Sequence, residues 1–350
     1  MKDERSIPLR DLTENKTSES WLDVKDMKDM ERIKLWKTSV PGNSPKLKED
    51  VMEIGEKKSD MLLTLSFIKA LPNDKFKDCK QAIDTYTKYC VGTVDDEYHD
   101  TFEDEPYLIP YIAEGSKKAV IVVPGGGYTF KSMEGEGTQI AEALQKSGIT
   151  AFVLWYRTNP YYQPIPLMDM QRAVRYVRYH AKEYGYEENR IGAIGFSAGG
   201  AQISLFMNVY QGKKTAYPGY EPDEIDKVDD RLDFEALIYP AFSYLYNQPM
   251  LFASFPAENV RQEAMRKKYL DEYNAVTHMR SAGIPHYISY GTKDDMVSLK
   301  QIEEYVKCLD ETGTPYRKFL VEGAGHGYGA AIGQKYHYWL EDYISWLKNL

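Results

Sequence analysis

The sequence predicts an α/β protein with a mostly parallel central sheet and helices on both of its faces. From about Lys118 to the end of the chain, short apolar runs typical of buried strands alternate with longer segments of helical periodicity. The first hundred residues lack this alternation. A chain of 350 residues is long for one ordinary domain but suits one large sheet with insertions.

The expected strands are short and rich in β-branched or aromatic residues. Ala119–Val123 is the clearest of them, because its continuous apolar run is typical of a strand buried on both faces. The other expected strands are Ile33–Trp36 at an edge, Tyr107–Ile112, Ile149–Trp155, Arg190–Ile194, Ala236–Tyr239, Pro285–Tyr290 and Tyr316–Val321.

The expected helices carry apolar side chains on one face. One stripe contains Met170, Ala173, Val174, Val177 and Ala181; others contain Leu299, Ile302, Val306 and Leu309, and then Trp339, Leu340, Tyr343, Ile344, Trp346 and Leu347. These stripes are predicted to be core.

The N-terminal part is organised differently. Residues 1–30 are polar and form an N-terminal extension, while residues 31–350 form the main domain. Residues 44–98 carry helix-like segments and are predicted to be a helical insertion, for which a lid, a dimerisation element and structural padding are open alternatives. Tyr210–Arg231 is rich in Pro, Gly and acidic residues and is predicted to be a surface loop.

Residues Gly195–Gly199 have the pattern G-x-S-x-G between an expected strand and the expected helix 200–207. A serine on such a sharp strand-to-helix turn has an exposed hydroxyl next to a helix N-terminus. Ser197 is therefore the candidate nucleophile.

A glycine-rich loop, Pro124-Gly125-Gly126-Gly127-Tyr128, directly follows the strand Ala119–Val123. Glycines can present backbone N–H groups without side chains in the way, which is what a developing oxyanion requires. Gly126 and Gly127 are assigned as donors, together with the N–H of Ala198. Tyr128 is assigned to substrate binding.

Two adjacent aspartates follow the strand Pro285–Tyr290 and compete for one role. A carboxylate just beyond a strand end can hold a catalytic imidazole in the required tautomer. Asp294 is chosen for its Asp-x-x-Val spacing to Val297, while Asp295 is the alternative and is otherwise expected to cap the helix that begins near Ser298.

His326 is the candidate general base because glycines flank it on a loop after the last expected strand. The order serine, acid, histidine is the order of an α/β-hydrolase. The remaining histidines are predicted to be surface or packing residues: His99, His180, His278, His286 and His337.

Composition excludes several classes of function. A net charge of −9 and a pI near 5.4 argue against nucleic-acid binding. Three cysteines do not form a disulfide framework, no Cys/His cluster has metal-ligand spacing, and no signal peptide or membrane span is evident. We expect a cytoplasmic protein without metal, organic cofactor, nucleic-acid or membrane partner; a homo-oligomer is left open.

The segments Val122–Tyr128, Glu134–Glu136 and Gly195–Gly200 resemble the acetyl xylan esterases, relatives of the hormone-sensitive-lipase-like carboxylesterases in the α/β-hydrolase superfamily. The resemblance covers roughly Ile33–Pro41 and Asp104–Leu350. Pro124 stands where the lipase-like relatives usually carry His, so their specificity does not transfer.

The resemblance implies a serine esterase that removes acetyl groups from sugars. It gives Ser197, Asp294 and His326 the roles of nucleophile, acid and base. The expected partner is thus a small ester, such as an acetylated carbohydrate. The alternatives are a prolyl-type serine peptidase, a longer-chain or feruloyl carboxylesterase, and a non-catalytic binding protein on the same fold.

Overall fold

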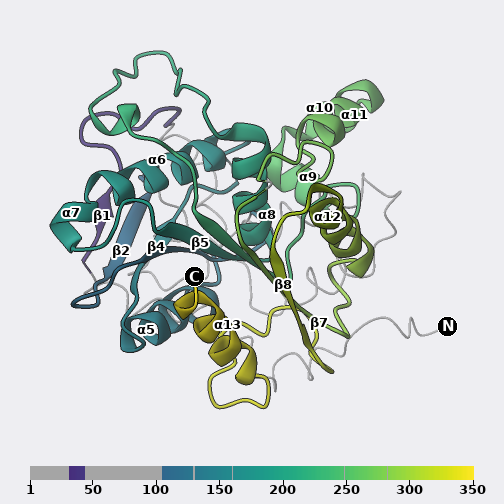
Figure 1. Cartoon of the computed structure of the whole chain (residues 1–350). Helices are drawn as coiled ribbons and strands as arrows, with labels where there is room; N and C mark the ends of the chain where they lie inside the picture. The colour runs from purple at the N-terminus through teal and green to yellow at the C-terminus, as the bar shows by residue number, and fades with distance from the viewer. Residues whose placement is uncertain (1–30, 44–104, 129–130, 160, 248, 282) are drawn as a thin grey trace, which may run out of the picture.

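The computed structural model describes residues 31–43, 105–128, 131–159, 161–247, 249–281 and 283–350 (Figure 1). The predicted N-terminal extension, residues 1–30, and the predicted helical insertion, residues 44–98, therefore lie outside the described residues.

The described strands form one mostly parallel sheet in the order β1-β2-β4-β3-β5-β6-β7-β8. Strands β4, β3, β5, β6, β7 and β8 run parallel to one another, while β2 pairs antiparallel with both β4 and β1 at one edge. The bounds are β1 (Ile33–Lys34), β2 (Tyr107–Tyr111), β3 (Ala119–Val123), β4 (Thr150–Trp155), β5 (Ile191–Phe196), β6 (Phe234–Ile238), β7 (His286–Gly291) and β8 (Tyr316–Val321).

Helices cover both faces, as the sequence predicts. Figure 1 shows α5 and α13 on one side of the sheet and α6 and α8 on the other. The helical elements are η4 (Glu134–Thr138), α5 (Gln139–Lys146), α6 (Ile165–Tyr179), α7 (Ala181–Tyr184), α8 (Ala198–Leu205), η5 (Phe206–Tyr210), η6 (Ile225–Lys227), α9 (Pro249–Ser254), α10 (Ala257–Val260), α11 (Glu263–Glu272), α12 (Leu299–Thr312) and α13 (Tyr338–Lys348).

Most residues of the predicted apolar stripes are buried in the core, while Leu299, Ile344 and Trp346 are partly buried. All five stripe residues of α6 and α7 are buried, and so are Ile302, Val306 and Leu309 of α12. Helix α12 ends where Gly313 takes the left-handed conformation at φ 65° that favours glycine. These stripes pack the helices against the apolar sheet, and this burial holds the helices and the sheet together.

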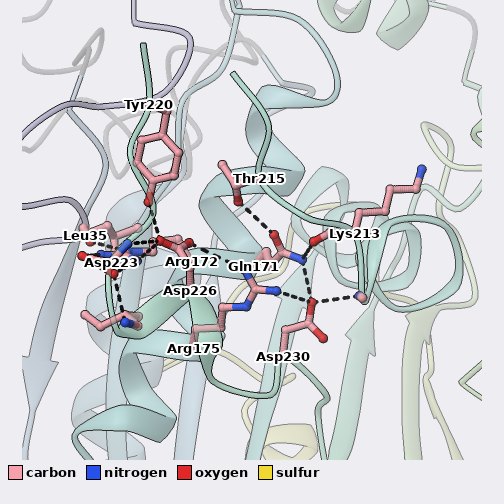
Figure 2. A network of polar contacts seen from close by, with 12 residues as sticks. Leu35, Gln171, Arg172, Arg175, Lys213, Thr215, Tyr220, Asp223, Asp226 and Asp230 are labelled. Atoms are coloured by element: carbon pink, nitrogen blue, oxygen red, sulfur yellow. Dashed lines mark hydrogen bonds and ion pairs between the residues drawn. The ribbon is translucent and has the colours of Figure 1, made fainter. Parts of the chain in front are cut away.

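Ion pairs and hydrogen bonds join the segment between η5 and β6 to helix α6 (Figure 2). Arg172 donates to Leu35 O and forms a paired contact with both oxygens of Asp223. Arg175 pairs with Asp226 and Asp230. The predicted surface loop is thus anchored to helix α6 by ion pairs whose arginines are buried.

One buried ion pair joins neighbouring strands at the end of the sheet away from Ser197. Glu235 of β6 and His286 of β7 are fully buried, with 2.6 Å between Glu235 Oε1 and His286 Nε2. The other imidazole nitrogen donates to Ile284 O, and the Tyr305 hydroxyl donates to Glu235. Burial alone lowers the pKa of His286, but the charge and hydrogen bond of Glu235 outweigh it, so the pKa lies above 6.5.

Glu235→Gln is expected to destabilise the protein in a pH-dependent way. A raised folded-state pKa means that the pairing stabilises fully below the unfolded pKa, near 6.5, and is lost as pH rises through the folded value. The difference in unfolding free energy between parent and variant should therefore be largest near pH 6, about 3 kcal/mol, and should shrink at alkaline pH. Urea unfolding at several pH values measures this difference.

Glu183→Gln is the matched control, because its pairing with His180 is largely exposed and should contribute little. A difference for Glu235→Gln that stays constant with pH would contradict the assignment of a charged His286.

Candidate active site

Ser197 lies on a strained turn between β5 and α8. Its φ of 50° and ψ of −115° are unusual for a residue with a side chain. The turn is held from outside: Ser197 N donates to Ile238 O of the neighbouring strand, and Ser197 O accepts from Ala201 N and Ala241 N. The backbone conformation is thus imposed by the surrounding fold, a feature that clusters at functional sites.

The glycines of the G-x-S-x-G pattern are required by close backbone packing. A Cβ on Gly195 would lie 2.4 Å from Gly199 O, and a Cβ on Gly199 would lie 2.0 Å from Val123 O. Neither contact is possible for a real side chain. The turn can therefore sit against the end of β3 only because these positions carry glycine.

His326 lies between Ser197 and Asp294 in a continuous hydrogen-bonded series. Its Nε2 is 2.8 Å from Ser197 Oγ, and its Nδ1 is 2.8 Å from Asp294 Oδ2. Because a carboxylate only accepts hydrogen bonds, the proton of the neutral imidazole belongs on Nδ1. Nε2 is then free to accept the proton of the serine hydroxyl.

The structure distinguishes between the two aspartates. The second oxygen of Asp294 accepts hydrogen bonds from Met296 N and Val297 N, at 3.0 Å and 2.9 Å. These hydrogen bonds explain the Asp-x-x-Val spacing, because the turn that ends at Val297 fixes the carboxylate that faces His326. Asp295 is exposed, and helix α12 begins four residues later at Leu299.

The glycine-rich loop lies beside the serine turn because β3 and β5 are parallel neighbours that end together, with Val123 opposite Gly195. Gly126 and Gly127 have positive φ angles of 134° and 62°, which glycine adopts readily. Ala198 N belongs to the first turn of α8, where backbone N–H groups have no partner within the helix. The three assigned donors thus lie on two adjacent segments around Ser197.

Tyr128 is directed into the fold. Its side chain is 1% exposed, and its hydroxyl donates to Gln202 Oε1 at 3.1 Å. Tyr128 O also accepts from Asn159 N. These contacts anchor the end of the glycine-rich loop to α8 and to the segment after β4, whereas the predicted contact with substrate stays a prediction.

Two residues that sequence reasoning did not assign connect the site. Glu136 accepts hydrogen bonds from Gly125 N and from the Tyr239 hydroxyl, both at 2.8 Å. Burial raises the pKa of Glu136, while the two hydrogen bonds and the nearby His326 act in the opposite direction. The pattern Glu134–Glu136 signalled the resemblance above, but nothing in it indicated a role.

The described residues contain no group of three or more His, Cys, Asp or Glu side chains arranged to hold a metal ion. Within the same part of the chain, every helix is too short or too polar to cross a bilayer.

Fold and site together define a protein of the α/β-hydrolase type. Its structure is similar to that of an acetyl ester-xyloside bifunctional hydrolase from Caldicellulosiruptor lactoaceticus, with a TM-score of 0.60 and 29% identity over 70% of this chain and 88% of that one. A thermophilic esterase from Thermogutta terrifontis has the same fold, with a TM-score of 0.56 and 23% identity over 70% and 89% of the two chains.

Residues 107–309, more than half of the chain, match the BD-FAE family, and the protein belongs to that family. Among curated proteins, an acetylxylan esterase of Xylanibacter ruminicola is 28% identical over 240 residues, which are 67% of this chain. They are only 46% of that relative, so the chain spans less than half of its length.

Asp294→Asn and Asp295→Asn should differ sharply in activity if the observed geometry is the working one. Replacing the orienting carboxylate favours the wrong imidazole tautomer, so kcat for a simple ester should fall by on the order of 10³–10⁴ in Asp294→Asn. Asp295→Asn is a matched control one residue away and should change kcat by less than about threefold. Steady-state rates of the purified variants test this, and equal losses would contradict the assignment.

Proposed function

We propose that the protein is a serine esterase that hydrolyses short-acyl esters, above all acetyl esters on sugars or xylo-oligosaccharides. The observation that carries the proposal is the uninterrupted series Asp294–His326–Ser197 beside a glycine-rich loop. The names of the relatives support the ester class, and two of them refer to acetyl or xylose-containing compounds.

The proposed chemistry is two-step acyl transfer. Ser197 Oγ attacks the ester carbonyl carbon while its proton moves to His326 Nε2, and the carbonyl oxygen becomes an oxyanion. The N–H groups of Gly126, Gly127 and Ala198 are proposed to hold that oxyanion, at a few kcal/mol per donor. The protonated imidazole then gives its proton to the leaving alcohol, and water releases the acid by the same route.

Asp294 has a distinct part in this scheme. Its carboxylate is buried against His326 and stabilises the imidazolium that forms in each step. The side chain keeps its own hydrogen bonds to the turn throughout, so the imidazole has one orientation only.

The aromatic segment after β6, residues 241–260, contributes mainly to the core. Four of its rings are almost fully buried: Phe242, Tyr244, Phe252 and Phe255. Phe242 stacks on Tyr305 and Phe255 on Tyr269, each with ring centroids 4.0 Å apart. Rates on a series of esters with acyl chains of increasing length measure which chain length the enzyme prefers.

Initial rates on p-nitrophenyl esters from acetyl to dodecanoyl, with Ser197→Ala beside the parent, test the proposal. A small acyl pocket should reduce kcat/KM by roughly tenfold or more between acetyl and butanoyl, because each added methylene must be accommodated. The variant should be inactive on every ester. Acetylated xylo-oligosaccharides are the next substrates to assay.

A flat profile or a preference for long chains would contradict the short-acyl proposal. Faster cleavage of an aminoacyl-proline reporter than of an acetyl ester would instead favour a peptidase. The proposed cytoplasmic location, which implies the trimming of imported oligosaccharides, is tested by fractionation, and recovery from the culture medium would contradict it.

A further inference from the structure

Glu136 is buried beside the glycine-rich loop. The two oxygens of its carboxylate face two different parts of the site. It lies on η4 and is 5% exposed. Oε2 accepts from Gly125 N, and Oε1 accepts from the Tyr239 hydroxyl. The ion pairs of the described residues do not include Glu136, so its burial is not offset by a paired Lys or Arg there.

Tyr239 extends this contact to the loop that carries His326. Its hydroxyl accepts from Gly329 N at 3.0 Å while donating to Glu136. Its ring and the His326 imidazole are packed in a T-shaped arrangement, with ring centroids 4.9 Å apart. Tyr239 follows β6 directly and has a φ of 37°, which is unusual for a residue with a side chain.

A backbone contact closes the arrangement. Ala330 N donates to Gly135 O at 2.8 Å, and Gly329 approaches Gly135 so closely that a Cβ on it would lie 2.8 Å from that oxygen. The histidine loop is therefore attached to the residue next to Glu136 as well as to Tyr239. The glycine-rich loop, the residue that follows β6 and the histidine loop therefore all contact the turn that carries Glu136.

The chemistry of the contacts favours a carboxylate. Both groups that face Glu136 donate hydrogen bonds, and only a deprotonated carboxylate accepts from both without presenting a donor of its own. At Gly125 there is little freedom to adjust, because a Cβ there would lie 2.6 Å from Phe196 O and 2.9 Å from the Ser197 Cβ. The direction of the Gly125 N–H thus controls how the following glycines approach the serine.

We propose that Glu136 is a positioning residue that fixes the glycine-rich loop and the His326 loop relative to Ser197. This inference rests on the proposed esterase function and adds a residue to it. Glu136 touches no reacting atom; it acts by holding Gly125 and, through Tyr239, Gly329. Its loss should weaken the binding of the oxyanion more than the binding of the neutral ester.

Glu136→Gln tests this role with little change in shape. The amide keeps one acceptor but turns an N–H₂ group towards either Gly125 N or the Tyr239 hydroxyl. Tyr239→Phe is the second variant, because it removes only the bridging hydroxyl. Glu134→Gln is the matched control: it is on the same turn and loses the same charge, but its carboxylate accepts from Gln139 instead.

Two readouts separate positioning from general stability. The first is the split between kcat and KM for p-nitrophenyl acetate. The second is the inhibition constant of methyl trifluoromethyl ketone. When this inhibitor binds, Ser197 Oγ bonds to the ketone carbon, the serine proton moves to His326 Nε2, and the ketone oxygen becomes an oxyanion. Thermal unfolding of each variant is recorded in parallel.

We expect kcat to fall and the ketone inhibition constant to rise, each roughly tenfold to hundredfold, in Glu136→Gln, with KM within about twofold of the parent. Tyr239→Phe should shift both in the same direction, and Glu134→Gln should change neither. Should Glu136→Gln fail to fold, Tyr239→Phe decides the question with the same criteria.

Folded variants whose kcat and ketone inhibition constant match the parent would overturn the inference, and so would a lowered unfolding temperature with an unchanged inhibition constant. Failure of the proposed function gives a different result. In that case the parent and Ser197→Ala hydrolyse the ester equally, whatever the residue at position 136.

Discussion

The close approach of the serine turn to the end of β3 is the constraint on which the rest of the site depends. Gly199 packs so tightly against Val123 O that no side chain fits, and Ser197 takes up a strained backbone as a result. Parallel pairing of β3 with β5 brings the glycine-rich loop to the same edge. The candidate nucleophile and the proposed oxyanion donors therefore lie directly after the ends of two paired strands.

The histidine reaches this edge from farther along the chain and needs its own supports. Asp294 fixes the imidazole from β7, and Tyr239 packs on it from β6. Both supports follow the ends of parallel strands, β6 directly beside β5 and β7 next to β6 in the sheet. The order of the strands thus brings residues distant in sequence together, and buried hydrogen bonds then fix their orientation.

Local signals in the sequence predicted much of this arrangement. The strands were predicted because each is a compact apolar run, and the fold class followed from their alternation with amphipathic helices. The choice of Asp294 over Asp295 agrees with the geometry, since a short turn places two backbone N–H groups on Asp294. Flanking glycines distinguished His326 from the other histidines because glycines are frequent in loops and are visible in the sequence.

What sequence reasoning missed depends on partners far away in the chain. Strand β6 begins at Phe234, two residues before the predicted start; Glu235 interrupts the apolar run in the sequence, and its partners His286 and Tyr305 lie far along the chain. Glu136 lies in the polar run Glu134–Gly137, and its partner Tyr239 is 103 residues away. The hydrogen bond from the Tyr128 hydroxyl to Gln202 joins residues 74 positions apart, and no local pattern indicated it.

The most direct measurement of the central claim is to trap the acyl-enzyme. The protein is mixed with a large excess of p-nitrophenyl acetate, quenched in acid during the initial burst, digested and sequenced by mass spectrometry. The account predicts one added acetyl group on the peptide containing Ser197, and on Ser197 itself. Steady hydrolysis without an acetylated Ser197, undiminished in Ser197→Ala, would contradict it.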